Sequence, residues 1–149
     1  MSDIRFRAVL LEDNDAIRKA LRETLANRGY EIFSFTSPAI CPMQLEPECR
    51  CKGGQRCVDI IISDLDMPTI TGLQFIENQK RKNCKCQHIA LMSGFWTEED
   101  ELQAKKFGCK VFSKPFDLFE LNQWLDRVER QISPTRKLTN WFQDQDTLS

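Results

Sequence analysis

Strand-like and helix-like segments alternate along most of this chain, and this alternation restricts the folds that it can adopt. Short apolar runs typical of buried strands are separated by segments in which apolar residues recur every three or four positions, as on one face of a helix. The pattern predicts an α/β domain in which helices cover both faces of a doubly wound, five-stranded parallel sheet. The predicted strands are residues 8–11, 30–35, 58–63, 89–93 and 110–113, and the predicted helices are residues 14–28, 72–82, 97–108 and 117–132.

The composition fits one globular domain. The chain has 149 residues, of which 41% are hydrophobic and 29% charged, and its formal net charge is -1. Without a basic bias, direct nucleic-acid binding is not expected to be the main function. The N-terminus has no apolar run suited to a signal peptide, and no segment is long enough to span a membrane. We therefore expect a cytoplasmic protein.

Polar residues suited to catalysis follow four of the predicted strands. Glu12 and Asp13 come after the first strand, and Asp64 comes after the third. Ser93 ends the fourth strand and Lys114 follows the fifth. In the strand order 2-1-3-4-5, the third strand lies beside the first, and the C-terminal ends of parallel strands meet at one edge of the sheet. These five side chains are thus expected in one cleft.

Three carboxylates in one cleft repel one another unless a cation lies among them. Two unit charges ~4 Å apart cost ~4 kcal/mol at an effective dielectric constant of about 20, so all three stay ionised only beside a positive ion. Oxygen ligands completed by water suit Mg²⁺. The ion, a lysine and a hydroxyl together can neutralise the oxygens of a phosphoryl group, which leaves Asp64 as the nucleophile that forms an aspartyl-phosphate.

Four short motifs resemble the receiver domain of two-component response regulators. They are "LLEDND", "IIISDLDMPTITG", "LMSG" and "FSKPF", which occur in this order, each at a predicted strand. The resemblance covers residues 7–132 and implies a flavodoxin-like fold. It also implies that Asp64 accepts a phosphoryl group from a sensor histidine kinase or a phosphotransfer protein. Such a domain signals through protein–protein contacts with an output partner and is not an enzyme beyond its own phosphorylation and dephosphorylation.

The resemblance assigns a role to each residue of the cleft. Asp13 and Asp64 would hold Mg²⁺ with help from the backbone carbonyl of Asp66, and Glu12 would act mainly through water. The oxygens of the phosphoryl group would be bound by Ser93 and Lys114.

Two alternatives remain at this point. The pair Asp64 and Asp66 also resembles the nucleophile motif of haloacid dehalogenase-type phosphatases, which combine Mg²⁺ with a Ser or Thr, a Lys and an acidic pair. In that family the acidic pair comes last, whereas here Glu12 and Asp13 come first, and Pro68 stands where Thr or Val is preferred. The other alternative is a receiver-like module, responsive to metal or redox state, that is retained only for binding.

The sequence departs from the receiver pattern near the cleft. The position three residues before the lysine, often aromatic in receivers, is Val111, and the neighbouring aromatic residue is Phe112. The usual aromatic switch is therefore in doubt. A bulky residue, Phe95, lies two positions after Ser93, where it could hinder a water that attacks the phosphorylated acceptor. The alternative is that Phe95 and Trp96 simply pack on the next helix.

No output domain is expected after the receiver, which we place at residues 1–132. Residues 133–149 are too few for one, and we expect a partly disordered tail in which Trp141 and Phe142 dock on the body or on a partner. A stand-alone receiver or a phosphorelay intermediate is the resulting expectation.

Seven cysteines are unusual for a protein of a reducing compartment. Residues 38–57, which contain four of them, are expected to form an irregular insertion that replaces most of the second helix. Clustered thiolates indicate a structural zinc site or, as a lesser alternative, an iron–sulfur cluster, whereas ordinary thiols are the competing interpretation. Cys41 lies earlier in the segment, and Cys109 is expected to be a core thiol. Five cysteines should lie at the pole opposite Asp64: Cys49, Cys51, Cys57, Cys84 and Cys86.

Overall fold

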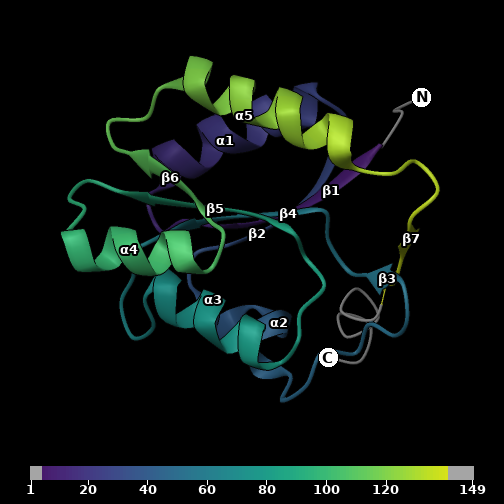
Figure 1. Ribbon diagram of the computed structural model, residues 1–149. Coiled ribbons are helices and arrows are strands. Elements are labelled where there is room, and N and C mark those ends of the chain that lie inside the picture. The colour runs from purple at the N-terminus through teal and green to yellow at the C-terminus, as the bar shows by residue number, and fades with distance from the viewer. Residues whose placement is uncertain (1–4, 141–149) are drawn as a thin grey trace.

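A parallel sheet of five strands, in the order β2-β1-β4-β5-β6, forms the middle layer of the structure. The computed structural model describes residues 5–140 (Figure 1). With the short strand β3 left out of the count, the order is the predicted 2-1-3-4-5. The strands are β1 (Phe6–Leu11), β2 (Tyr30–Phe35), β4 (Ile60–Asp64), β5 (His88–Ser93) and β6 (Lys110–Ser113).

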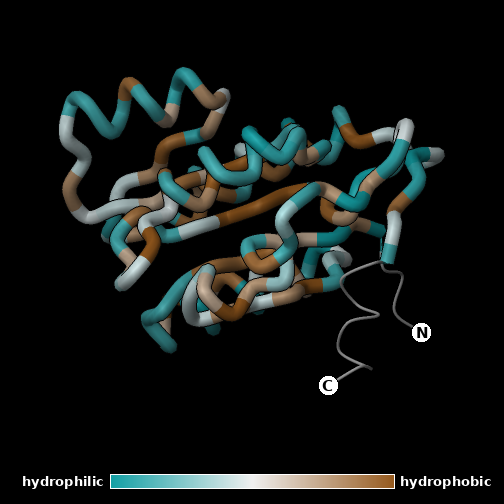
Figure 2. The backbone as a smooth tube through the Cα atoms, turned by 90° about the horizontal axis from the view of Figure 1, so that it is seen from below, coloured by the Kyte–Doolittle hydropathy of each residue, from teal (hydrophilic) through white to brown (hydrophobic). Residues whose placement is uncertain are grey.

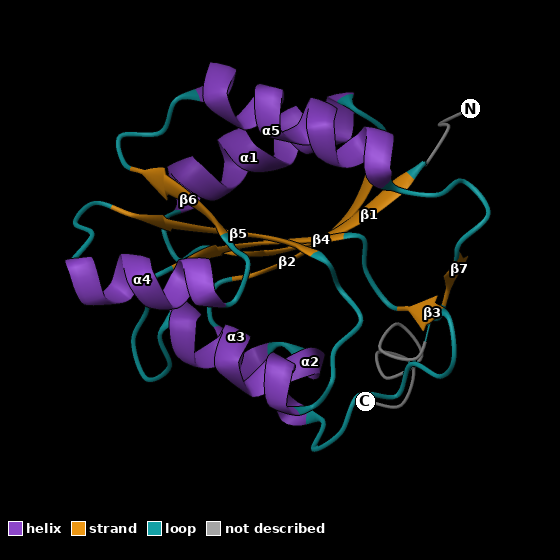
Figure 3. Ribbon diagram, viewed as in Figure 1, coloured by secondary structure: helices purple, strands orange, loops and turns teal. Residues whose placement is uncertain are grey.

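Helices cover both faces of the sheet, as the alternating pattern predicts (Figure 3). Helices α1 (Asp15–Asn27) and α5 (Leu118–Gln131) lie on one face. The other face carries α2 (Pro42–Leu45), α3 (Gly72–Arg81) and α4 (Glu98–Lys106). Within residues 5–140, no helix combines the length and the apolar character needed to cross a bilayer.

The two faces of the sheet build two separate apolar cores, because successive side chains of a strand point to opposite sides. On β1, Val9 and Leu11 belong to the core under α3, whereas Ala8 and Leu10 belong to the core under α1 and α5. All four are fully buried. Figure 2 shows the same arrangement, with hydrophobic backbone segments concentrated in the central strands and hydrophilic segments outside. A strand buried on both faces is rigid, which suits it to hold a reactive side chain at its end.

Residues 38–57 contain little regular structure. The segment contains a 3₁₀ turn at Pro38–Ile40 and the single helical turn of α2. Both begin with a proline, which suits the first position of a helix but not its interior. The segment ends in β3 (Gln55–Arg56). These short elements agree with the prediction that the segment is irregular.

The C-terminal segment packs against the body up to Asn140. Strand β7 (Lys137–Leu138) pairs in parallel with β3, so that Gln55 lies opposite Lys137. This pairing was not predicted, and it shows that residues 137–138 of the expected tail join the folded body. Trp141 and Phe142, for which docking was predicted, lie outside the described residues.

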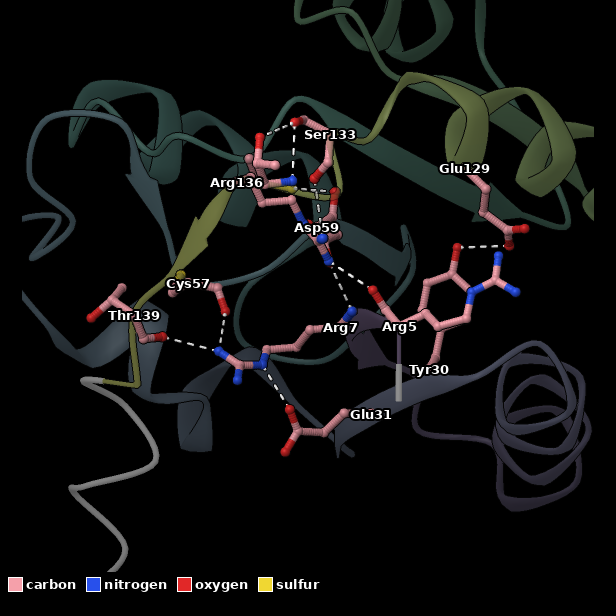
Figure 4. A network of polar contacts seen from close by, with 12 residues as sticks. Arg5, Arg7, Tyr30, Glu31, Cys57, Asp59, Glu129, Ser133, Arg136 and Thr139 are labelled. Atoms are coloured by element: carbon pink, nitrogen blue, oxygen red, sulfur yellow. Dashed lines mark hydrogen bonds and ion pairs between the residues drawn. The ribbon is translucent and has the colours of Figure 1, made fainter. Parts of the chain in front are cut away.

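A buried carboxylate, Asp59, anchors this segment at the pole where β4 begins (Figure 4). Its two oxygens accept hydrogen bonds from the Arg136 guanidinium at 2.7 and 2.6 Å, and the backbone N–H of Arg7 donates to it at 2.9 Å. The Arg7 guanidinium in turn donates to the backbone oxygens of Cys57 and Thr139. Since Asp59 is completely buried, its charge depends on these partners.

Candidate functional site

The three acids predicted to lie together do so. Glu12 and Asp13 follow β1, and Asp64 is the last residue of β4, which pairs directly with β1. One carboxylate oxygen from each of these residues lies within 4.8 Å of the other two. Glu12 and Asp64 are buried, whereas Asp13 is exposed at the mouth of the cluster.

Lys114 links the two buried acids. Its Nζ lies 3.1 Å from Oε1 of Glu12 and 3.2 Å from Oδ1 of Asp64. The residue follows β6, and its backbone N–H donates to the carbonyl oxygen of Ser93 at 2.8 Å, which ties the ends of β5 and β6 together. The lysine therefore reaches across the sheet edge to the ends of β1 and β4, as predicted.

The charge of the cluster is not balanced by its own side chains. Burial raises the pKa of Asp64, while Lys114 and the backbone N–H of Asp66 lower it and Asp13 raises it further. Burial likewise raises the pKa of Glu12, against a hydrogen bond from the backbone of Asn14. Three carboxylates against one ammonium leave two negative charges. The donor set, oxygen atoms with one open to solvent, fits a divalent hard cation such as Mg²⁺.

Ser93 lies beside the cluster, completely buried, with its hydroxyl engaged by Asp66. Ser93 Oγ lies 2.8 Å from Oδ2 of Asp66 and 2.9 Å from the carbonyl oxygen of Phe95, both of which are placed to accept its proton, and it accepts the backbone N–H of Phe95 at 3.0 Å. This pairing was not anticipated, because it depends on how the ends of β4 and β5 lie side by side. Asp66 is not one of the three clustered acids, and a role for its backbone carbonyl in metal binding stays a prediction.

The loop after Asp64 is held tightly against the strand end. Ile70 N–H donates to the carbonyl of Pro68 at 2.8 Å, and Thr69 between them has φ 74°, so that these three residues form a γ-turn. A β-branched residue in this region is strained. Gly72 then opens α3 where a Cβ would overlap the backbone oxygen of Asp64. Only glycine allows the helix to begin so close to Asp64.

The aromatic residues near the cluster take different positions. Phe112 points into the core under α1 and α5, where it makes an edge contact with Trp124, and Val111 packs on the opposite face. Trp96 packs on the same core as Val111, and its indole N–H donates to the carbonyl of Phe112 at 2.8 Å. Phe95 is 76% exposed. The packing interpretation thus holds for Trp96 and is wrong for Phe95.

The cysteines lie in the core under α3 or against it, and all seven are free thiols. Cys57 precedes β4 and Cys86 precedes β5, so both lie at the pole opposite Asp64, as predicted. Cys109 is buried without a cysteine partner among the described contacts, as expected of a core thiol. Within the described residues, the acids Glu12, Asp13 and Asp64 are the one group of three or more Cys, His, Asp or Glu whose ligand atoms all lie within 4.8 Å. The predicted thiolate site is therefore not in a closed metal-binding geometry.

Fold and site together define a doubly wound α/β protein with three acids and a lysine gathered at the C-terminal edge of its parallel sheet. The family model described as "Response regulator receiver domain" matches residues 8–126. The chain therefore belongs to the response regulator receiver domain family, a family of signalling domains, and the resemblance inferred from the four motifs is confirmed.

Curated relatives and solved structures agree with this assignment. The chain is 25% identical over 130 residues to the transcriptional activator protein PfeR of Pseudomonas aeruginosa, covering 85% of this chain and 38% of that protein. It is 29% identical over 132 residues to the KDP operon transcriptional regulatory protein KdpE of Escherichia coli, covering 85% of this chain and 52% of that protein. The chain thus spans about half or less of these relatives.

Among solved structures, the chemotaxis protein CheY4 of Vibrio cholerae aligns with a TM-score of 0.64 and 25% identity, over 83% of this chain and 98% of that one. A response regulator receiver protein from Pseudomonas putida aligns with a TM-score of 0.67 and 23% identity, over 83% and 97% of the two chains. The likeness to the Pseudomonas putida protein, at 23% identity, supports the fold alone. The chemistry is inferred from the acidic cluster.

Proposed function

We propose that this protein is a cytoplasmic response regulator receiver in which Asp64 accepts a phosphoryl group from the phosphohistidine of a sensor histidine kinase or phosphotransfer protein, in a Mg²⁺-dependent reaction. The observation that carries the proposal is the position of Lys114, whose ammonium lies 3.2 Å from the acceptor carboxylate and 3.1 Å from Glu12. A cation held at the acceptor is placed to neutralise charge on an incoming phosphoryl group.

The reaction uses the groups at the strand ends in distinct roles. A carboxylate oxygen of Asp64 attacks the phosphorus as the bond from phosphorus to the imidazole nitrogen breaks, and the imidazole leaves with that electron pair. When bound to Glu12, Asp13 and Asp64, Mg²⁺ supplies positive charge for the phosphoryl oxygens. Lys114 holds one of those oxygens. The buried position of Asp64 keeps the acceptor in a fixed orientation.

Ser93 provides a route from this chemistry to a change of surface. To donate to a phosphoryl oxygen, its hydroxyl has to turn away from its present acceptors, Oδ2 of Asp66 at 2.8 Å and the carbonyl oxygen of Phe95 at 2.9 Å. The carbonyl of the same residue is bound by the backbone N–H of Lys114. A shift of Ser93 would therefore reposition the ends of β5 and β6 together, and an output partner would recognise the altered surface. The match to the receiver family favours this function over a phosphatase of the haloacid dehalogenase type.

The test is direct phosphorylation by a small donor. The full chain is incubated with acetyl phosphate and Mg²⁺, and a hydroxylamine-labile phosphoryl group is expected on the peptide that contains Asp64. Chelation of Mg²⁺ by EDTA should prevent the labelling, because two negative charges of the cluster would then remain uncompensated. An absence of labelling with Mg²⁺ present, or equal labelling with EDTA, would refute the proposal.

Phe95 is expected to prolong the life of the aspartyl-phosphate. Its ring is 76% exposed, and its backbone N–H donates to Ser93 Oγ at the edge of the site. Replacing it by alanine should shorten the phosphorylated lifetime severalfold, because a bulky apolar group restricts the approach of water. The lifetime is measured as loss of label after removal of the donor. Leu102→Ala, which removes a similarly exposed side chain on α4, is the control, and equal lifetimes in all three proteins would exclude a shielding role.

A further inference from the structure

We propose a second metal site in this protein, at the pole opposite the phosphoacceptor: a four-thiolate site for one zinc-class ion, formed by Cys49, Cys51, Cys57 and Cys84. We call these residues the thiolate quartet. The site is separate from the Mg²⁺ chemistry of the proposed function and would serve the architecture of the irregular segment.

The topology brings the members of the quartet together. Strands β4 and β5 are neighbours, with Ile60 opposite His88, so the residues that precede these strands lie side by side. Cys57 and Cys84 come from these two approaches. The loop that carries Cys51 folds back toward Cys57 through a turn closed by the Gln55 N–H, which donates to the carbonyl of Lys52 at 3.0 Å.

Contacts among the thiols support the grouping. The side chains of Cys51 and Cys57 are hydrogen bonded to each other. The thiol of Cys49 is likewise hydrogen bonded to that of Cys51. Cys84 lies close enough to Cys49 and Cys51 to feel their charges. Four sulfur ligands brought together from two neighbouring loops match the donor set of a structural zinc site.

Backbone amides already point at two of the sulfur atoms. The N–H groups of Cys51 and Lys85 donate to the Cys49 sulfur, and the N–H of Cys86 donates to the Cys84 sulfur. Such bonds stabilise a thiolate relative to a thiol and orient it, as the outer shell of a metal site does. Two of these three bonds arise from the Cys-x-Cys spacing, in which residue i+2 donates to residue i, and the bond from Lys85 links the two loops.

Cys86, which also lies at this pole, is excluded from the quartet by its own contacts. Its sulfur lies 3.6 Å from the carbonyl oxygens of Asp59 and His88, and it is placed to donate its proton to them. A thiolate in that position would have one backbone N–H, that of His88, against two carbonyl oxygens. Cys86 is thus suited to remain a neutral thiol behind the site.

The quartet also has charge around it and room to close. Four thiolates and one divalent ion carry a net charge of two negatives, and Lys82 and Lys85 line the cavity that Cys49 and Cys51 border. Closure is required, because sulfurs ~2.3 Å from a zinc ion in tetrahedral geometry stand ~3.8 Å apart, and no three described sulfurs are mutually within 4.8 Å. Gly53 and Gly54, between Cys51 and Cys57, have open space where a Cβ would lie, so no neighbouring atoms there block a movement of this loop toward the site.

The test is titration of the reduced full chain with Co²⁺ in a chelator-free buffer. Binding should release the thiol protons to the buffer and produce one equivalent of the intense sulfur-to-cobalt charge-transfer absorption of tetrahedral thiolate sites, which one equivalent of Zn²⁺ then abolishes. Carboxylate coordination at the acidic cluster gives no such band. A folded, reduced wild-type chain without this band would overturn the proposal.

Substitutions define the ligands. Cys57→Ser and Cys84→Ser should lose the tetrahedral thiolate spectrum, whereas Cys109→Ala and Cys86→Ala should keep it with one equivalent of metal. Loss of the spectrum in Cys86→Ala, or its retention in Cys84→Ser, would refute the assignment of the quartet. If the serine variants fail to fold, alkylation of the wild type decides. The two half-exposed thiols, Cys49 and Cys84, should react with iodoacetamide without metal and be protected by Zn²⁺, and equal reactivity would contradict the site.

Discussion

Asp64→Asn is expected to reduce Mg²⁺-dependent phosphorylation by acetyl phosphate to background. The substitution keeps the size of the side chain but removes the nucleophilic oxygen and one ligand of the acidic cluster. Asp66→Asn is the matched control, since it makes the same chemical change two residues away, where an amide oxygen can still accept the hydrogen bond from Ser93. That variant should remain phosphorylated. Label on the same peptide of Asp64→Asn would show that another residue is the acceptor.

The same variant should be more stable than the wild type when Mg²⁺ is absent. Burial raises the pKa of Asp64 in the fold above its ordinary value of 3.8, so the folded state binds a proton more readily than the unfolded chain. The ionised carboxylate therefore costs stability at neutral pH, and this cost is relieved as the pH falls through the raised pKa toward 3.8. Asparagine removes the cost at all pH values. Thermal unfolding at neutral pH measures the difference, and it checks that a loss of labelling is not caused by unfolding.

Arg136→Ala is expected to lower the free energy of unfolding by about 3–5 kcal/mol, the usual cost of leaving a buried charge without its partner. Asp59 is completely buried, and Arg136 supplies two of its hydrogen bonds. After the substitution, the Asp59 carboxylate keeps the hydrogen bond from the backbone N–H of Arg7. Urea denaturation with a two-state analysis measures the change.

Two comparisons make this prediction specific. Arg127→Ala removes an exposed arginine of α5 and should change the stability by less than about 0.5 kcal/mol. The double variant Asp59→Asn, Arg136→Ala should be less destabilised than the sum of its single variants, because the uncompensated charge is gone. If Arg136→Ala unfolds at the same urea concentration as Arg127→Ala, residues 133–140 do not contribute to the fold.

Periodicity in the sequence was sufficient to predict the central sheet and its helices. Each strand of that sheet is a run of apolar residues with its own local pattern, and the parallel arrangement follows from the alternation with helices. The rule that the C-terminal ends of parallel strands meet then brought Glu12, Asp64 and Lys114 together without coordinates. The acidic cluster was therefore predictable because it depends on topology alone.

Contacts between side chains distant in sequence were not predictable in this way. Asp59 was interpreted as part of an apolar strand, and its partner Arg136 is 77 residues away in a segment expected to be a tail. The bond between Ser93 and Asp66 requires the relative positions of two loops. For the cysteines, topology predicted the correct pole, but it does not determine the distances between sulfur atoms, which depend on the loop that holds Gly53 and Gly54.

The anchoring of the C-terminal segment by Asp59 also fixes the place that the chain has reached at Asn140. Asp59 precedes β4 and Asp64 ends it, so the anchor and the proposed acceptor are separated by the length of that strand, ~16 Å at about 3.3 Å per residue. Asn140 therefore lies toward the pole opposite the sheet edge at which, in the proposed function, a kinase would act. A fluorescent protein or affinity tag fused at the C-terminus is accordingly the better choice for labelling, because its point of attachment is separated from Asp64.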